Sequence, residues 1–385
     1  MTVTKAAGFR SAGIAVGLKS TGKPDLALVV NDGPHPAAAV VFTGNRAQAN
    51  PILWSKQVMR ARTPRAIVLN SGGANCFTGD FGFDTSRLTA EAAAAELGLE
   101  SSEVLVCSTG LIGTGDQVFR DKIVTNVPTL VGQLSDDDET AAAAILTTDS
   151  VEKNGFFESE AGWRIAAIAK GAGMLAPGLA TMLVVITTDA VMTNESLERA
   201  LATGSELSFN RLDSDGCMST NDQVTLLASG ASGVEADEVQ FAEALTEVMR
   251  DLAKQLQADA EGATHDIDIE VVGAADEQDA EEVGRAVARN NLFKAAIFGN
   301  DPNWGRVLAA IGTTKADFDP YKVDVSFNGV RLCSEGAPDR PVDDCDLTPR
   351  NTHVLIDLKA GEHTATILTN DLTHEYVHEN SAYSS

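Results

Sequence analysis

The chain has 385 residues, of which 44% are hydrophobic and 22% charged, so a normal core can form and global disorder is excluded. It carries 29 lysines and arginines against 55 aspartates and glutamates, a formal net charge of −26. That charge opposes binding to nucleic acid or to an anionic membrane, so an anionic ligand would need a local cluster of positive charge.

Several short apolar runs predict strands, bounded by turn-forming residues. In chain order they are Leu26–Val30, Ala39–Phe42, Ala66–Leu69, Val104–Cys107, Arg164–Ala169, Met182–Thr187, Tyr321–Phe327, His353–Leu358 and Thr364–Leu368. The run Ile267–Val271 alternates strictly between apolar and acidic residues, which indicates a strand with one face toward solvent.

Helices are expected between these strands. Phe241, Leu245, Val248, Leu252 and Leu256 repeat at the spacing of one helical face. Further helices are predicted from acidic starts and apolar repeats over Thr85–Leu97, Asp136–Leu146 and around Ala280–Val287. Because strands and helices mix without a regular βαβ repeat, the pattern favours a mixed α/β (α+β) fold in two lobes over a single Rossmann sheet.

The sequence gives no targeting or membrane signal. The first ten residues lack an apolar stretch, so we expect no secretory signal. The longest apolar run, Met182–Ile186, is far below the roughly 20 residues that span a bilayer. Five cysteines without CxxC spacing are typical of reduced thiols, with a catalytic cysteine as the alternative. We therefore expect a cytoplasmic protein.

Two short motifs resemble cofactor sites but stand in the wrong context. His374–His378 reads H-E-x-x-H, the helical zinc motif of metalloproteases, yet the sequence ends seven residues later, which leaves little room for a third ligand. Gly171–Ala176 matches a loose dinucleotide fingerprint, but Pro177 follows where the fingerprint needs a helix. We therefore expect neither zinc nor a nucleotide cofactor.

The most informative segment is a Gly/Pro-rich loop that leads from Lys170 through Ala180 and Thr181 into an apolar strand. If the Ala180–Thr181 bond is cut, Thr181 becomes N-terminal, and its α-amine, with a pKa near roughly 8, can act as general base for its own hydroxyl. The same hydroxyl can make the cut by attacking the Ala180 carbonyl, followed by hydrolysis of the ester. Alternatively, Thr181 is only a β-branched residue that begins a strand.

This segment closely resembles the self-cleavage motif K-G-x-G-M-x-A-P-x-x-A-T-M-L of the ornithine acetyltransferase (glutamate N-acetyltransferase, ArgJ-type) family. Six further blocks are similar to family blocks and run in order: Cys107–Gly113, Leu146–Asp149, Ser219–Asp222, Asp259–Thr264, Phe298–Val307 and His378–Ser385. The chain departs from many members at Ser71 and Gly73, where they carry Ala and Asn.

The resemblance implies the two-lobed fold of DmpA- and ArgJ-type proteins, in a self-processed N-terminal-nucleophile enzyme. An α chain of residues 1–180 would carry the oxyanion hole. A β chain of residues 181–385 would carry the nucleophile and the C-terminal lobe. Two chains of each kind are expected to form a heterotetramer, and the family needs no metal or tightly bound cofactor.

The resemblance also implies roles for individual residues. Thr181 is the expected nucleophile of self-cleavage and of acetyl transfer, and Thr109 and Gly110 are the expected oxyanion hole. Lys170 would supply a local cation for an anionic substrate, and Glu261 could hold an ammonium group. The full set of expected substrate contacts is Thr147, Lys170, Thr181, Glu261, Asn380 and Ser385, with Thr148 as an alternative to its neighbour Thr147.

The expected reaction moves the acetyl group of N2-acetyl-L-ornithine to L-glutamate by a ping-pong route through an ester on Thr181. Three alternatives remain open. A bifunctional enzyme would also take acetyl groups from acetyl-CoA. An N-terminal-nucleophile amidohydrolase or aminopeptidase would give the acyl group to water. A binding protein on the same fold would catalyse nothing.

Overall fold

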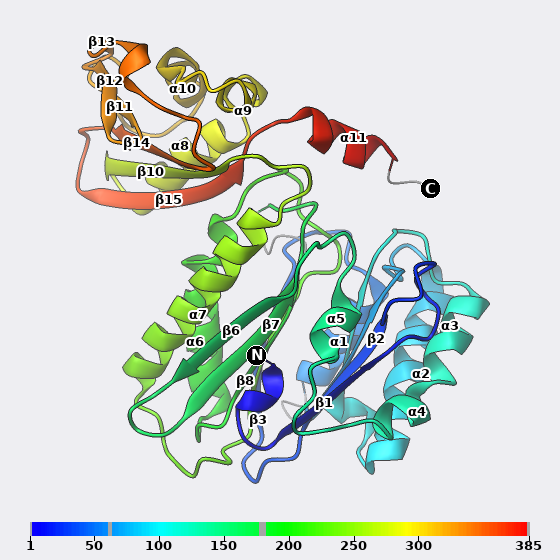
Figure 1. Cartoon of the computed structure of the whole chain (residues 1–385). Helices are drawn as coiled ribbons and strands as arrows, with labels where there is room; N and C mark the ends of the chain where they lie inside the picture. Colours follow the sequence, from blue (N-terminus) through cyan, green and yellow to red (C-terminus); the bar gives the residue numbers. More distant parts are fainter. Residues whose placement is uncertain (1, 61–63, 177–181, 383–385) are drawn as a thin grey trace. The chain divides into compact units, whose positions relative to one another are not determined.

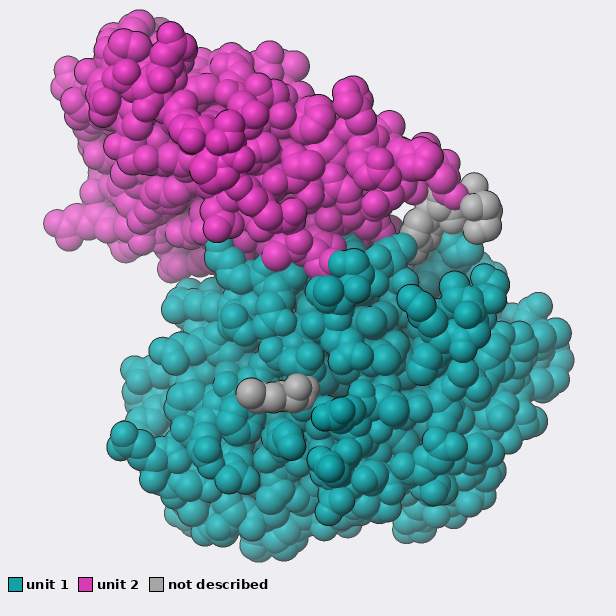
Figure 2. Space-filling view, viewed as in Figure 1, with its two compact units in different colours: residues 1–172, 178–210, 218–256 teal, residues 173–177, 211–217, 257–385 magenta. Residues whose placement is uncertain are grey.

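The structure is a computed structural model that describes residues 2–60, 64–176 and 182–382. Ala180, Thr181 and Ser385 therefore lie outside the described residues. The chain divides into two compact units (Figure 2), each with its own hydrophobic core. Unit 1 comprises residues 1–172, 178–210 and 218–256, and unit 2 comprises residues 173–177, 211–217 and 257–385.

Unit 1 is built on two β-sheets (Figure 1). The first has the order β1-β2-β4-β5, with β1 (Phe9–Ile14), β2 (Leu26–Asn31), β4 (Ala66–Ser71) and β5 (Val104–Thr109). The second has the order β3-β9-β8-β7-β6, with β3 (Ala37–Phe42), β9 (Gln223–Ala228), β8 (Leu183–Thr188), β7 (Arg164–Lys170) and β6 (Lys153–Glu158). β4 runs parallel to β5 and β8 runs parallel to β9, so each pair brings two strand ends to one edge.

One short helix of unit 1, α5 (Ala141–Ile145), contacts strands of both sheets, and the core around it draws side chains from both. Helices α1 (Asn50–Met59) and α2 (Gly79–Leu97) pack against β5. They are followed by α3 (Gln117–Val124) and α4 (Val127–Val131). Beside the second sheet lie α6 (Asn194–Glu206) and α7 (Glu238–Ala258), as Figure 1 shows.

Unit 2 contains one mixed sheet in the order β13-β12-β11-β14-β10-β15. Its strands are β10 (Asp266–Ala274), β11 (Asp324–Phe327), β12 (Val330–Ser334), β13 (Ala337–Pro338), β14 (Asn351–Asp357) and β15 (His363–Asn370). Its helices are α8 (Glu277–Ala288), α9 (Asn291–Phe298), α10 (Trp304–Ile311) and α11 (His374–Ala382). α8 packs closely on β15, because a Cβ added at Gly284 would lie 2.6 Å from the Ile367 side chain.

The mixed α/β fold predicted from the sequence is confirmed. The predicted apolar face of α7 is fully buried, and strands form at or within a few residues of the predicted runs. The predicted helix Asp136–Leu146 is wrong in its first half, since only Ala141–Ile145 is helical. The Asp138 carboxylate accepts hydrogen bonds from the amides of Thr140 and Ala141, so the acidic run precedes the helix. β1, β6, β9, β12 and β13 were not predicted.

The two units do not coincide with the predicted chains 1–180 and 181–385, which stay a prediction. β7 precedes the Ala180–Thr181 bond and β8 follows it, and the two pair antiparallel over their whole length. The two predicted chains therefore share a sheet and a core, and a cut between them would leave them held together. Among the described residues, no helix is long and apolar enough to cross a membrane.

Candidate active site

The residues that follow the predicted nucleophile are fixed in unit 1 at one edge of the second sheet. The amide of Met182 donates a 3.1 Å hydrogen bond to Oδ1 of Asp222, and Met182 accepts one of 3.3 Å from the amide of Gln223. Across the sheet, Lys170 at the end of β7 pairs in register with Leu183 at the start of β8. Thr181 itself lies outside the described residues, but its covalent neighbour Met182 is anchored here.

The predicted oxyanion-hole residues stand where β5 ends. Thr109 is buried, and its carbonyl accepts a 3.0 Å hydrogen bond from the amide of Gly73. Gly110 has φ +132°, and a Cβ added to it would lie 2.5 Å from Gly73 N. Only glycine fits this close approach of two backbones, which fixes the Thr109–Gly110 peptide firmly at the strand end.

Lys170 is buried, and its ammonium group donates a 3.3 Å hydrogen bond to the Thr109 hydroxyl. The same nitrogen lies 3.9 Å from Oδ2 of Asp149. The lysine therefore connects the end of β7 in one sheet with the end of β5 in the other. A hydroxyl that accepts from a cation becomes a stronger donor, because hydrogen bonds in a chain polarise one another.

Asp149 organises this cluster. Its Oδ1 accepts from Lys153 Nζ at 2.7 Å and from the amide of Gly171 at 2.6 Å. Its Oδ2 accepts from the amide of Thr147 at 3.0 Å. Burial alone would raise the pKa of Asp149, but the charges of Lys170 and Lys153 outweigh burial and lower the pKa to about 2.

A third lysine, Lys19, approaches the same cluster. Its ammonium donates a 3.0 Å hydrogen bond to the carbonyl of Leu146, one residue before Thr147. Burial lowers the pKa of Lys19, with the nearby charge of Asp25 acting in the opposite direction. Lys19 and Lys153 were not predicted as site residues, because nothing in their local sequence distinguishes them from ordinary surface lysines.

The side chain of Asn221 ties the strand ends together. Its Nδ2 donates to the carbonyls of Ala74 at 2.6 Å and Ser108 at 2.8 Å, and the residue is buried. The Ser108 hydroxyl in turn donates a 2.6 Å hydrogen bond to Asn70 Oδ1. Asn221 belongs to the block Ser219–Asp222, which the sequence analysis noted without assigning it a role.

Comparison with known proteins decides the family. The family model described as the ArgJ family matches residues 10–385. The arginine biosynthesis bifunctional protein ArgJ of Streptomyces avermitilis is 56% identical to this chain over 386 residues, with 100% of both chains covered. This chain belongs to the ArgJ family.

Two other relatives widen the comparison. The protein of the same name from Mycobacterium leprae is 49% identical, with 100% of this chain and 96% of the relative covered. An ornithine acetyltransferase from Mycobacterium tuberculosis, solved in complex with ornithine, is 47% identical at a TM-score of 0.44, covering 46% of this chain and 94% of that chain. The sequence comparisons confirm the predicted family, and with it the prediction of an acyltransferase enzyme.

The predicted site residues of this ArgJ-family chain fall into three groups. In unit 1 the structure brings together Thr109, Gly110, Thr147 and Lys170, with Thr147 rather than Thr148 bonded to Asp149. Glu261 and Asn380 belong to unit 2. Ala180, Thr181 and Ser385 lie outside the described residues, and the functional role of each predicted residue stays a prediction.

Within unit 2, Glu261 stands on a tight turn between α7 and β10. Gly262 has φ +62°, and a Cβ there would lie 2.3 Å from the amide nitrogen of Tyr376. The Glu261 carboxylate lies against the backbone of Gly173, where an added Cβ would be 2.5 Å from Oε2. Gly262 therefore allows α11 to approach the Glu261 turn, and Gly173 allows the Glu261 carboxylate to approach the loop that leads toward the predicted cleavage site.

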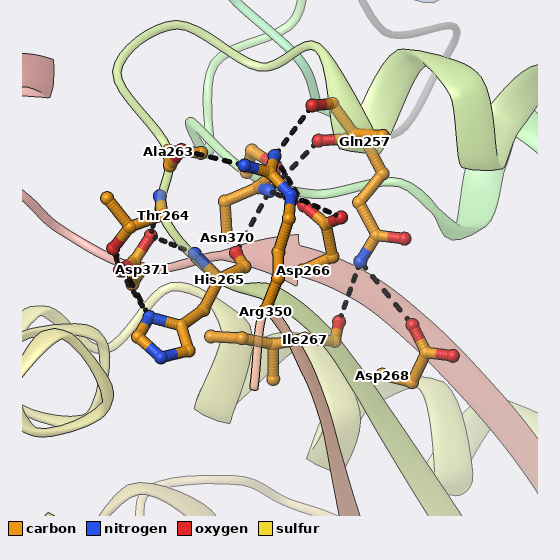
Figure 3. Close-up of polar contacts among 12 residues, drawn as sticks. Gln257, Ala263, Thr264, His265, Asp266, Ile267, Asp268, Arg350, Asn370 and Asp371 are labelled. Atoms are coloured by element: carbon orange, nitrogen blue, oxygen red, sulfur yellow. Dashed lines mark hydrogen bonds and ion pairs between the residues drawn. The ribbon is translucent and has the colours of Figure 1, made fainter. Parts of the chain in front are cut away.

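A buried polar network holds the base of this turn (Figure 3). Asp371 accepts hydrogen bonds from the amides of Thr264 and His265, at 2.9 and 3.0 Å, and from both of their side chains. Asn370 donates to the carbonyls of Gln257 and His265, at 3.0 and 3.2 Å. The network therefore fixes both ends of the segment that carries Glu261.

Asp215 in unit 2 holds the first part of the loop that leads from Lys170 to Ala180, called the cleavage loop below. One oxygen of this carboxylate accepts from the amide of Leu175 at 2.7 Å, and the other accepts from the Tyr376 hydroxyl at 2.8 Å. Burial, reinforced by the charge of Asp215, raises the pKa of Tyr376. Asp215 and Tyr376 thus position the loop five residues before Ala180, and neither was predicted.

The H-E-x-x-H motif lies on α11, which places His374 and His378 one turn apart. The His374 ring packs edge-on against Phe298, with ring centroids 5.4 Å apart. Across the parts of the chain that the structure describes, no group of three or more His, Cys, Asp or Glu residues is arranged to hold a metal ion.

A catalytic cysteine, the alternative left open by the sequence, finds little support in unit 1. Cys107 lies in β5, two residues before Thr109, and is fully buried. Burial raises the pKa of its thiol, which opposes the thiolate that nucleophilic chemistry requires.

Proposed function

We propose that this chain transfers the acetyl group of N2-acetyl-L-ornithine to L-glutamate through an acetyl ester on Thr181, after self-cleavage between Ala180 and Thr181. The observation that carries the proposal is the contact of Lys170 with the Thr109 hydroxyl, at the edge of unit 1 where β8 begins two residues after Thr181. Its family supplies the substrates, since relatives are named for arginine biosynthesis and one for ornithine acetyltransferase.

In the first half-reaction, Thr181 Oγ attacks the acetyl carbonyl while its own α-amine takes the hydroxyl proton. The negative charge that develops on the carbonyl oxygen is met by the Thr109 hydroxyl and the Gly110 amide. One such donor typically contributes about 3–4 kcal/mol to the transition state. Lys170 strengthens the Thr109 donor and adds positive charge beside it. The ammonium of Thr181 then protonates the departing ornithine amine.

In the second half-reaction, the amine of L-glutamate attacks the Thr181 ester and regenerates the free hydroxyl. Ornithine and glutamate share an α-amino acid frame, so the same groups can bind both in turn. We assign Lys170 and Thr147 to an anionic substrate group and Glu261 to an ammonium group. Asn380 and Ser385 are proposed as further contacts on the strength of the family motif.

The relatives' name, bifunctional protein, favours a second donor. We propose that acetyl-CoA also acetylates Thr181, after which glutamate takes the group as before. Turnover with acetyl-CoA and glutamate at a rate comparable to the acetylornithine reaction is the expected result. Turnover at least about 100-fold slower would restrict the enzyme to acetylornithine.

We further propose that the cleaved chains 1–180 and 181–385 remain associated, two of each, as a cytoplasmic heterotetramer. The antiparallel pairing of β7 with β8 supports the association of one α chain with one β chain. Native mass spectrometry tests the number of copies, and a species with one chain of each kind would overturn the tetramer.

The decisive experiment is intact-mass analysis of the purified protein together with an acetyl-transfer assay. We expect two chains, the second beginning at Thr181, and transfer from N2-acetyl-L-ornithine to L-glutamate. Thr181→Ala should remain one chain and be inactive, whereas Thr181→Ser should keep part of both activities. Cleavage of the Thr181→Ala variant would refute the assignment, and rapid release of acetate without glutamate would indicate a hydrolase.

A further inference from the structure

Asp222 is a buried carboxylate that none of the expected roles uses. It directly precedes β9 and is 1% exposed. Its Oδ1 accepts the amide of Met182, but its Oδ2 accepts no hydrogen bond from any residue that the structure describes. A buried carboxylate oxygen without a donor is costly, so such a group points to a missing partner.

Covalent geometry limits where that partner can be. Met182 N is bonded to the carbonyl carbon of Thr181, so the α-nitrogen of Thr181 lies three bonds away and within roughly 4 Å of Met182 N in any conformation. The Asp222 carboxylate binds Met182 N at 3.1 Å, so its Oδ1 can be no more than roughly 7 Å from that nitrogen. Two successive backbone nitrogens can donate to the two oxygens of one carboxylate.

We propose that Asp222 is the positioning residue for the α-amine that self-cleavage creates at Thr181, with Oδ2 as its acceptor. This inference rests on the proposed function. In the uncut chain the Thr181 nitrogen is an amide. After the cut it becomes an amine that can donate to Oδ2 and direct its lone pair toward Thr181 Oγ. The carboxylate then stabilises the ammonium formed when the amine takes the hydroxyl proton, as the third group of a catalytic triad does for its base.

The electrostatic surroundings agree with this role. Burial raises the pKa of Asp222 well above its usual range, while the Met182 amide, polar groups of Ser219 and the charge of Lys170 act in the opposite direction. Ser219 lies near, but its hydroxyl does not complete a hydrogen bond to Oδ2. A new ammonium partner would favour the ionised carboxylate, and the carboxylate would in turn favour the ammonium.

The test is Asp222→Asn, which keeps the shape and an acceptor for Met182. We expect self-cleavage to persist, because the uncut chain has no free amine at Thr181. The kcat of acetyl transfer should fall about 10- to 100-fold, the loss expected for one charge-assisted hydrogen bond, with KM little changed. The acid limb of the pH–rate profile should move to lower pH, because an amine without its carboxylate has a lower pKa.

The matched control is Asp189→Asn. Asp189 is equally buried and follows the far end of β8, where it accepts from the amides of Ala7 and Arg164. It should leave kcat and the pH profile unchanged. Normal kcat and an unmoved acid limb in a cleaved Asp222→Asn protein would overturn the proposal. Wild-type protein that is uncleaved or transfers no acetyl group would instead refute the proposed function.

A second measurement covers an Asp222→Asn protein that fails to fold. In wild-type protein labelled with ¹⁵N-threonine, the Thr181 α-amine should titrate above the ordinary range of about 7.7–8.0 for α-amines. Titration below that range would show that no carboxylate supports the amine and would also overturn the proposal. Asp222→Glu, which retains the carboxylate, should recover part of the kcat that Asp222→Asn loses.

Discussion

In unit 1 three lysines act on one carboxylate, whereas in unit 2 three aspartates act on one ammonium group. Lys19, Lys153 and Lys170 surround Asp149 in the first cluster. In the second, Lys294 donates to the carbonyl of Ser214, and burial lowers its pKa against the opposing charges of Asp215, Asp213 and Asp371. The first cluster is therefore centred on a carboxylate and the second on an ammonium group, although Asp25 also acts on Lys19 and Arg289 also acts on Asp213.

This difference shows how a chain of net charge −26 can still present a cation to a ligand. Like charges are buried together only at a cost, so their retention favours a role beyond stability. The Lys170 ammonium in unit 1, which contacts the Thr109 hydroxyl, suits an anionic group or a developing oxyanion. The carboxylates of Asp215 and Glu261 near Tyr376 in unit 2 suit an ammonium group.

The largest expected effect comes from replacing Lys170 and Lys153 of unit 1 one at a time. Lys170→Met should reduce kcat/KM about 100- to 1,000-fold, because it removes both the cation and the donor to Thr109. Lys153→Met should instead cost about 3–5 kcal/mol of unfolding free energy, since it breaks a fully buried ion pair. Steady-state kinetics and urea unfolding of both variants measure how each lysine contributes to activity and to stability. If Lys153→Met cost more activity than Lys170→Met, the assignment of roles would be reversed.

Replacing the carboxylates of unit 2 one at a time distinguishes substrate binding from support of the Glu261 turn. Glu261→Gln should raise KM about 10- to 100-fold with little change in thermal stability, because a charge-assisted contact to substrate is lost from a partly exposed turn. Asp371→Asn should lower thermal stability and also raise KM, since it loosens the base of the same turn. Asp276→Ala, which removes only the side-chain cap of α8, is the control and should leave KM unchanged. An unchanged KM in Glu261→Gln would remove Glu261 from substrate binding.

The same comparison shows what sequence patterns can and cannot predict. The apolar repeat of α7 has the helical period, and β7 and β8 are continuous apolar runs, so local sequence predicted these elements. Lys153 and Asp149 are four residues apart outside any helix, and no local pattern signals that they are paired and buried. Asp215 and Tyr376 are 161 residues apart. Contacts of this kind exist only once the chain is folded.

A smaller effect concerns the pH dependence of stability. The folded pKa of Asp149 is about 2, below the ordinary value, so its stabilisation is present above about pH 4 and is lost as pH falls through the folded pKa. Asp149→Asn breaks the same buried ion pair as Lys153→Met and should cost about 3–5 kcal/mol at pH 7. The cost should be about 1 kcal/mol smaller at pH 3. Urea unfolding at both pH values measures this difference.

Asp213 in unit 2 should show the opposite slope. Burial raises its pKa although Arg289 opposes the shift, so ionisation above the folded pKa weakens the native state. The unfolding free energy of the wild type should therefore rise relative to that of Asp213→Asn as pH falls. Parallel slopes for Asp149→Asn and Asp213→Asn would contradict the opposite electrostatics of the two clusters.

The smallest expected effect is that of Tyr376→Phe, which removes one hydrogen bond from Asp215. Asp215 keeps its bond to the amide of Leu175, so the cleavage loop should stay in place. The loss should be about 1 kcal/mol of unfolding free energy and less than about threefold in kcat. Tyr321→Phe, at a side chain 81% exposed, is the control for removing a hydroxyl. In this structure the Tyr376 hydroxyl donates to Asp215. A tenfold fall in kcat would contradict a purely structural role and would indicate that the hydroxyl also contacts the substrate.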